Sequence, residues 1–91
     1  MDQLPSLNAL KMFTVVGQVL NFSKAAEELN VTQGAVSRQI LRLEESLGFE
    51  LFIRQHRHLE LTDKASELLP EITRAFELME HSIEQLQATK S

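Results

Sequence analysis

Side chains that can make directional hydrogen bonds are concentrated in one segment of the sequence, NVTQGAVSRQILRLEESLG, residues 30–48. A glutamine can bond to adenine through two atoms, an arginine can bind guanine or a phosphate, and a serine can do either. Small residues allow close approach, and a methyl group can contact thymine. The segment therefore offers contacts to DNA base edges from Gln33, Gly34, Ala35, Ser37, Arg38 and Arg42. A merely solvated polar face would look the same, and Arg42 has a further alternative in pairing with Glu45 or Glu28.

Other polar side chains lie on either side of this segment. Ser23 and Thr32 lie where two helices are expected to begin, so each hydroxyl is expected to cap its helix. Each is also expected to contact a phosphate, because a helix N-terminus offers free N–H groups to an anion. Lys24 is a weaker candidate of the same kind. Arg54 and Arg57 flank an expected hairpin tip, where solvated charge is a reasonable reading.

The tip also contains a His-x-His pair, His56 and His58. On a strand both imidazoles would point to one side, as two metal ligands need, but no convincing third ligand follows from the sequence. We expect no metal or other cofactor, and solvated or phosphate-contacting histidines. The sequence also lacks a nucleophile with its base and orienting acid, and a glycine-rich phosphate loop, so we expect no catalysis.

Composition limits the class of protein. The chain has 91 residues, 43% of them hydrophobic, with three glycines, two prolines and no cysteine, which predicts a single mostly helical domain without disulfides. The net charge is −4, yet residues 1–61 carry six basic against seven acidic side chains, and residues 62–91 carry three against six. The N-terminal part can therefore present a local basic face. No apolar stretch resembles a membrane span or a signal peptide, so a cytoplasmic protein is expected.

Three helices are predicted in the N-terminal part. Apolar residues at spacing three predict a first helix capped by Ser6, with the stripe Leu7, Leu10, Phe13 and Val16. A short second helix opens at Ser23 and ends at Asn30. The third helix begins after Thr32 and ends at Gly48, with its buried stripe at Val36, Ile40, Leu43 and Leu47.

A hairpin and a long helix are predicted to follow. Phe49, Leu51 and Ile53 alternate before Arg54, and Leu59 and Leu61 alternate after Arg57. This pattern is typical of two short strands joined by a turn wider than two residues. From Thr62 to Lys90 the apolar residues recur every four and three positions, as in a heptad repeat. This helix, ~40 Å long at 1.5 Å per residue, exceeds what a core of this size covers. A homodimer interface is therefore expected at Ala65, Leu69, Ile72, Phe76, Met79, Ile83 and Leu86.

Two helices joined by a tight turn, with a polar first half on the second, form the helix-turn-helix arrangement that inserts a helix into the major groove. At this point the order of motifs resembles a known family, the LysR-type transcriptional regulators. The matching pieces are FSKAA, VTQGAVS, LEESLG, LFIRQHR and the closing LT. The start LPSLNALKMF is most similar to the subgroup with the glycine-cleavage activator and the beta-lactamase regulator.

This resemblance implies a mostly α fold, a winged helix-turn-helix with three helices and a two-stranded β-hairpin wing over residues 1–61, followed by a long linker and dimerisation helix over 62–91. It implies sequence-specific binding of a dimer to double-stranded DNA at an interrupted inverted repeat. The wing side chains Arg54, Arg57 and His56 are then expected at the backbone or minor groove. The family often has proline where this chain has Gly34.

Members of this family continue beyond the linker helix into an effector-binding domain, which these 91 residues do not include. The chain therefore resembles a DNA-binding fragment or a natural product without ligand control, and a small-molecule effector would act only through the missing domain. The competing hypothesis is a helical interaction module, an adaptor or antitoxin, that binds a protein through the heptad face of residues 65–86. A steep loss of duplex affinity with salt would favour DNA binding.

Overall fold

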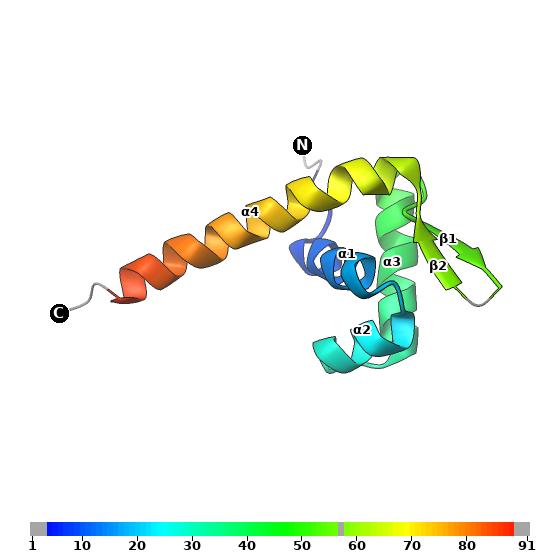
Figure 1. The fold of residues 1–91 in the computed structure, drawn as a ribbon, viewed down its shortest axis with the longest axis horizontal. Coiled ribbons are helices and arrows are strands. Elements are labelled where there is room, and N and C mark those ends of the chain that lie inside the picture. The colour runs from blue at the N-terminus through cyan, green and yellow to red at the C-terminus, as the bar shows by residue number, and fades with distance from the viewer. Residues whose placement is uncertain (1–3, 57, 89–91) are drawn as a thin grey trace.

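The computed structural model of the chain describes residues 4–56 and 58–88. Over these residues it shows four helices and one antiparallel two-stranded sheet (Figure 1), which confirms the predicted winged helix-turn-helix architecture with a long last helix. None of the described helices combines the length and apolarity needed to cross a membrane. The elements are α1 (Leu7–Val19), α2 (Phe22–Leu29), α3 (Gln33–Leu47), β1 (Phe52–Gln55), β2 (His58–Leu61) and α4 (Asp63–Ala88).

Local chemistry sets most helix ends. The hydroxyls of Ser6 and Thr32 accept hydrogen bonds from the backbone N–H three residues on, over 3.2 and 3.1 Å, as predicted for N-caps. Asn30 and Gly48 end their helices in the left-handed conformation, with φ of 60° and 84°. The prediction that Ser23 caps α2 is wrong, because α2 begins one residue earlier.

Asn21 caps α2 instead. Its Oδ1 accepts from the Lys24 N–H over 2.9 Å, and its own backbone is extended. Asn is as good a cap as Ser because its side-chain oxygen reaches the same N–H. Ser23 therefore lies in the first turn of α2 with its hydroxyl free for another role.

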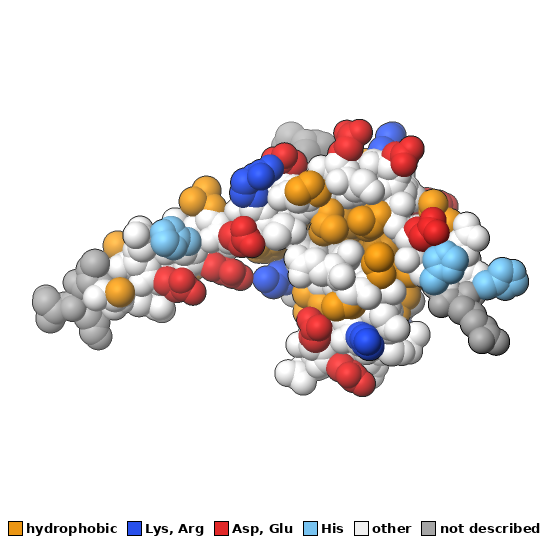
Figure 2. Space-filling view, in the orientation of Figure 1, with side chains coloured by type: hydrophobic (Ala, Val, Ile, Leu, Met, Phe, Trp, Pro, Cys, Tyr) orange, Lys and Arg blue, Asp and Glu red, His pale blue; other side chains and the backbone are white. Residues whose placement is uncertain are grey.

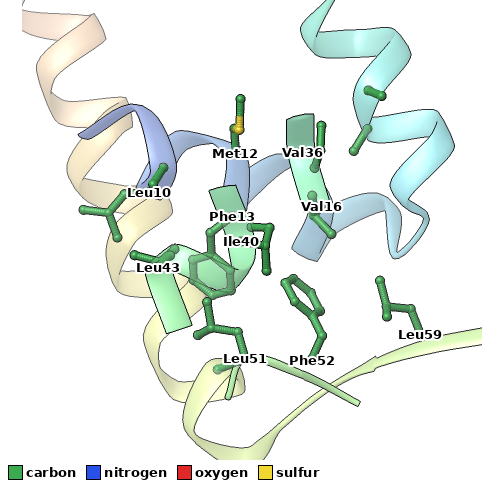
Figure 3. Packing of buried hydrophobic residues seen from close by; sticks show 14 residues of the cluster. Leu10, Met12, Phe13, Val16, Val36, Ile40, Leu43, Leu51, Phe52 and Leu59 are labelled. Atoms are coloured by element: carbon green, nitrogen blue, oxygen red, sulfur yellow. The ribbon is translucent and has the colours of Figure 1, made fainter. Parts of the chain in front are cut away.

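The core is centred on Phe13 of α1, which is fully buried (Figure 3). The buried stripe of α3 packs around it as predicted, with Val36, Ile40 and Leu43 inaccessible to solvent. Leu7 was expected to open the α1 stripe, but it is 55% exposed, so the stripe starts one turn later, at Leu10. The core therefore fixes α1 against the buried face of α3.

The hairpin is stacked on this core through Phe52. Its ring makes edge contacts with Phe13 and Phe22, with centroids 5.9 and 6.0 Å apart. The strands pair from Phe52↔Leu61 to Gln55↔His58, so two residues connect them and the expected wider turn is wrong. The predicted alternation is also shifted, since Leu51 precedes the strand and Ile53 is exposed.

The long helix α4 starts on the domain and then leaves it (Figure 1). Thr62 attaches its start: its N–H donates to the Leu51 carbonyl over 3.0 Å, and its hydroxyl donates to the Glu50 carbonyl over 2.7 Å. The same hydroxyl oxygen accepts from the Ala65 N–H. A backbone and a side-chain bond therefore fix the angle at which α4 departs from the wing.

Contacts with α1 extend this attachment along α4. Leu69 packs so closely on Gly17 that a Cβ on the glycine would lie 2.9 Å from Leu69 Cδ2. Further along, Lys11 lies 5.2 Å above the Phe76 ring and 3.3 Å from the Glu80 carboxylate. About two thirds of α4 thus has a neighbour in its own chain.

This packing corrects part of the predicted dimer seam. Ala65 is fully buried in the core of its own chain, so its assignment to the dimer interface is wrong. Leu69, Ile72 and Phe76 are half-buried against the same core. Beyond them, Met79 and Ile83 are 41% and 56% exposed, and Figure 2 shows hydrophobic side chains emerging along this outer part of α4.

Candidate nucleic-acid interface

The first half of α3 presents a polar surface opposite its buried stripe. Gln33, Gly34, Arg38 and Arg42 are exposed, whereas Ala35 and Ser37 are half-buried on its flanks. The backbone around Gly34 is open, because a Cβ there would meet only the Arg38 Nη1 atom, at 3.5 Å. All six residues predicted to contact bases are therefore at least partly exposed to solvent on this helix.

The cations beside this surface have no carboxylate partner among the residues that the structure describes. Arg38, Arg42 and Lys24 are exposed and form no ion pair there. The alternative in which Arg42 pairs with Glu45 or Glu28 is therefore wrong. Away from this surface two described cations do form ion pairs, Lys11 with Glu80 at 3.3 Å and Arg74 with Glu71 at 2.6 Å.

An open crevice joins the start of α3 to the wing. Its volume is about 340 Å³, and it is lined by the start of α2, by Gln33 and by side chains of both strands. Arg54 lies at its wing side with its guanidinium 5.0 Å above the Phe22 ring, a cation–π contact that orients the group without neutralising it. His56 and His58 also line the crevice, whereas Arg57 lies outside the described residues.

The two hydroxyls predicted at helix starts have different partners. Thr32 caps α3, as predicted. Ser23 donates to Gln33 Oε1 over 2.9 Å and so connects the first turns of α2 and α3. At the wing, His58 Nε2 lies 3.0 Å from the Glu60 carboxylate, and the described residues contain no cluster of three or more potential metal ligands around either histidine.

Glu44 is a residue whose role the sequence did not reveal. A carboxylate late in a helix opposes the helix dipole, so the sequence gives Glu44 and Glu45 no evident role there except to lie away from an anionic ligand. Instead Glu44 Oε2 accepts from the backbone N–H groups of Leu51 and Phe52, over 2.8 and 3.3 Å. It attaches the wing to α3, and its spacing of seven residues from Leu51 carries no sequence signal that distinguishes it from Glu45.

The arrangement is a cationic, hydrogen-bonding surface made by three elements held in fixed relation. The crevice brings together Ser23, Gln33, Arg54 and His56, while Lys24, Arg38 and Arg42 lie on helices α2 and α3 beside it. Figure 2 shows histidines at the wing end of the molecule. A polyanion with hydrogen-bonding edges suits such a surface, because guanidinium groups bind phosphates and base acceptors and amides bind base edges.

Known proteins share this sequence pattern. Residues 7–66 match the family described as "Bacterial regulatory helix-turn-helix protein, lysR family". The chain is 49% identical over 81 residues to the HTH-type transcriptional activator AmpR of Providencia stuartii, covering 89% of this chain and 28% of that protein. It is 44% identical over 86 residues to the glycine cleavage system transcriptional activator of Escherichia coli (strain K12), covering 94% and 28%. The chain thus spans about 28% of the length of these curated relatives.

Solved structures agree with the sequence comparison. The crystal structure of the CbnR_DBD-DNA complex matches with a TM-score of 0.82 and 34% identity, over 92% of this chain and 97% of that chain. The BenM_DBD/benA site 1 DNA complex matches with a TM-score of 0.86 and 27% identity, over 96% and 100%. Family match, relatives and fold together place this chain in the lysR family of bacterial regulatory helix-turn-helix proteins.

Proposed function

We propose that the chain binds double-stranded DNA sequence-specifically, as the DNA-binding part of a dimeric transcriptional regulator rather than an enzyme. The observation that carries this proposal is the pair Arg38 and Arg42, exposed on α3 with no carboxylate partner among the described residues. Two similar domains were solved in complexes with DNA, which supports DNA as the ligand. The major-groove contacts in this proposal come from Gln33, Gly34, Ala35, Ser37, Arg38 and Arg42.

The wing and the helix starts supply the contacts that do not depend on sequence. Arg54, oriented by Phe22, binds the backbone or the minor groove. Phosphate contacts generally position a protein on the duplex, and base contacts specify the site. The backbone and wing contacts in this proposal are Ser23, Lys24, Thr32, Arg54, His56 and Arg57.

Dimerisation uses the outer part of α4. Residues 1–61 form the DNA-binding unit and residues 62–91 the linker and dimerisation helix, with the first turns of α4 packed on the unit. The apolar side chains Met79 and Ile83 are exposed along α4, and a contiguous apolar stripe is buried when two chains pair. The interface comprises Leu69, Ile72, Phe76, Met79, Ile83 and Leu86.

The two helices pair in antiparallel orientation. Parallel pairing would place the acidic side chains of the two chains beside each other, where they repel. Antiparallel pairing lowers this repulsion, because it brings the acidic side chains of one helix nearer to Arg74 and Lys64 of the other. The acidic residues that flank the apolar stripe are Glu67, Glu71, Glu77, Glu80 and Glu84. A twofold dimer of this kind reads an interrupted inverted repeat.

In this proposal, control of the regulator belongs to a region that corresponds to the part of the relatives beyond the match with this chain. Any small-molecule effector acts through that part and not through the DNA-binding surface. The regulator works in the cytoplasm and joins the nucleoid when it is bound to DNA.

Duplex titrations over a range of salt concentrations test the proposal. The logarithm of the binding constant is expected to fall linearly with the logarithm of the salt concentration, by about 0.9 per phosphate contact. Gln33→Ala should relax base preference at defined positions of a selected site. Arg54→Ala should weaken all sequences equally and lower the salt slope. Absence of duplex binding by the parent chain would contradict the proposal and favour a protein-interaction module.

The dimer is tested by placing one acid on each side of α4. Ile83→Asp buries an unpaired charge in the paired interface and is expected to give a monomer that loses about a hundredfold in affinity for the inverted repeat. Gln85→Asp adds the same charge on the opposite side of the helix and should leave the dimer intact. Sedimentation velocity and a duplex titration measure both variants. A dimer that survives Ile83→Asp would contradict this interface.

A further inference from the structure

The starting observation is the hydrogen bond between Ser23 and Gln33, which are ten residues apart. Ser23 Oγ donates to Gln33 Oε1 over 2.9 Å, across the turn that joins α2 to α3. Both side chains are exposed, and both line the crevice beside Arg54. Neither is needed to cap a helix, since Asn21 caps α2 and Thr32 caps α3. Both side chains are therefore free of a capping role, and the hydrogen bond that they form is with each other.

The direction of this bond restricts what Gln33 can offer. A glutamine reads adenine by accepting from N6 with its oxygen while it donates to N7 with its nitrogen, so both atoms must face the base edge. In this chain the oxygen is turned toward α2 by Ser23. Ser23 thus occupies one lone pair of this oxygen, whereas the amide nitrogen, a donor only, has no hydrogen-bond partner among the described residues.

From this geometry we infer that Ser23 is a specificity-determining positioning residue. It directs Gln33 to present its N–H groups to bases that offer acceptors in the major groove, guanine through N7 and O6 or thymine through O4, in preference to two-atom recognition of adenine. This inference rests on the proposed function, because it assigns the base read by one side chain of that surface. It gives Ser23 an effect on sequence preference although its hydroxyl touches no base.

The surroundings of the pair support a positioning role. Phe22, which precedes Ser23 in the sequence and also lines the crevice, orients Arg54 through its ring. Two consecutive residues at the start of α2 thus orient two DNA-facing side chains, one on α3 and one on the wing. Orientation before binding lowers the entropy lost when these side chains are fixed against DNA.

Binding-site selection from random duplexes tests the inference on the 91-residue chain. Ser23→Ala releases the Gln33 oxygen and is expected to raise the share of adenine at the position that Gln33 reads by about fivefold. Ser23→Thr keeps the hydroxyl and should retain the parent preference. Ser46→Ala removes a hydroxyl from the far end of α3 and should change no position. In a Gln33→Ala background, Ser23→Ala should have no further effect on base preference.

Two results would overturn the inference. The first is an unchanged base profile in Ser23→Ala with equal loss of affinity for all duplexes, which would make Ser23 a phosphate contact only. The second is a change in profile that persists when Gln33 is already alanine. The side-chain amide signals of Gln33, followed by NMR without DNA, give a separate reading: they should shift in Ser23→Ala and not in Ser46→Ala. Failure of the parent chain to bind any duplex would instead contradict the proposed function.

Discussion

Removal of the Glu44 carboxylate is the sharpest test of how the wing is attached. Its Oε2 atom accepts from the backbone N–H groups of Leu51 and Phe52, and both of these residues are buried. No strand partner replaces it at Leu51, because the strand begins at Phe52. In Glu44→Ala these donors lose a charged acceptor at the point where the chain turns from α3 into the wing.

The size of the effect follows from the two bonds. A hydrogen bond to a charged group contributes about 1.5–3 kcal/mol. The bond of 2.8 Å from Leu51 contributes most, and the bond of 3.3 Å from Phe52 contributes less. Since Glu44 is half-buried and water reaches part of the vacated space, we expect a loss of about 2–3 kcal/mol in the free energy of unfolding. In a domain of this size that lowers the Tm by roughly 8–20 °C.

Thermal denaturation followed by circular dichroism measures this loss at one fixed protein concentration, because pairing of chains also raises the Tm. Glu45→Ala is the matched control: it removes the same charge from the next residue, which is exposed. It should change the stability by less than about 0.5 kcal/mol. Equal Tm values for the two variants would refute the assignment of Glu44 as the attachment of the wing.

The glycines supply the remaining predictions. Gly17→Val should destabilise the fold by about 1–3 kcal/mol through overpacking against Leu69, and adding Leu69→Ala should restore part of that loss. Denaturant titration measures the free energy of unfolding of both variants. A double variant no more stable than the single one would contradict this contact. Gly48→Ala should cost about 1 kcal/mol because of its positive φ, although nothing lies within 4 Å of the added methyl. Gly34→Ala should instead stabilise α3 by about 0.5–1 kcal/mol, so equal signs at Gly34 and Gly48 would contradict the conformational explanation.

Features governed by short-range chemistry could be predicted from the sequence. The caps Ser6 and Thr32 and the helix ends at Asn30 and Gly48 depend on one side chain and the nearest turn, so composition and spacing were sufficient. The prediction of Ser23 as the cap of α2 failed because Asn21, two residues earlier, is an equally good cap. Helix α2 begins at Phe22, whose ring packs against Phe52, a residue distant in the sequence.

Which residues of β1 are buried could not be predicted, for a related reason. Alternation assumes that a strand is regular from its first apolar residue, but Leu51 and Phe52 are consecutive and both are buried. The carboxylate of Glu44 satisfies both of their N–H groups and permits this irregular entry. A period-two pattern contains no information about an acceptor on a distant helix.

The heptad seam shows the same limit at larger scale. Its period correctly predicted a helix with one apolar face, but periodicity does not say which molecule covers that face. Ala65 is covered by the core of its own chain, and Leu69 is half-buried against Gly17. Likewise, the six base-contact candidates could be chosen by residue type, whereas the orientation of Gln33 by Ser23 is visible only in three dimensions.

The close contact of Gly17 with Leu69 has a consequence for the spacing of the DNA site. Together with the Lys11–Glu80 pair it makes α4 a stiff arm, continuous with the body that carries α3. In a dimer built on such arms, the distance and the rotation between the two recognition helices are set by the protein. Inserting about five base pairs between half-sites turns one of them to the opposite side of the duplex. A stiff arm cannot follow that rotation, so the DNA site of the proposed dimer should tolerate changes of sequence in the spacer but not changes of its length.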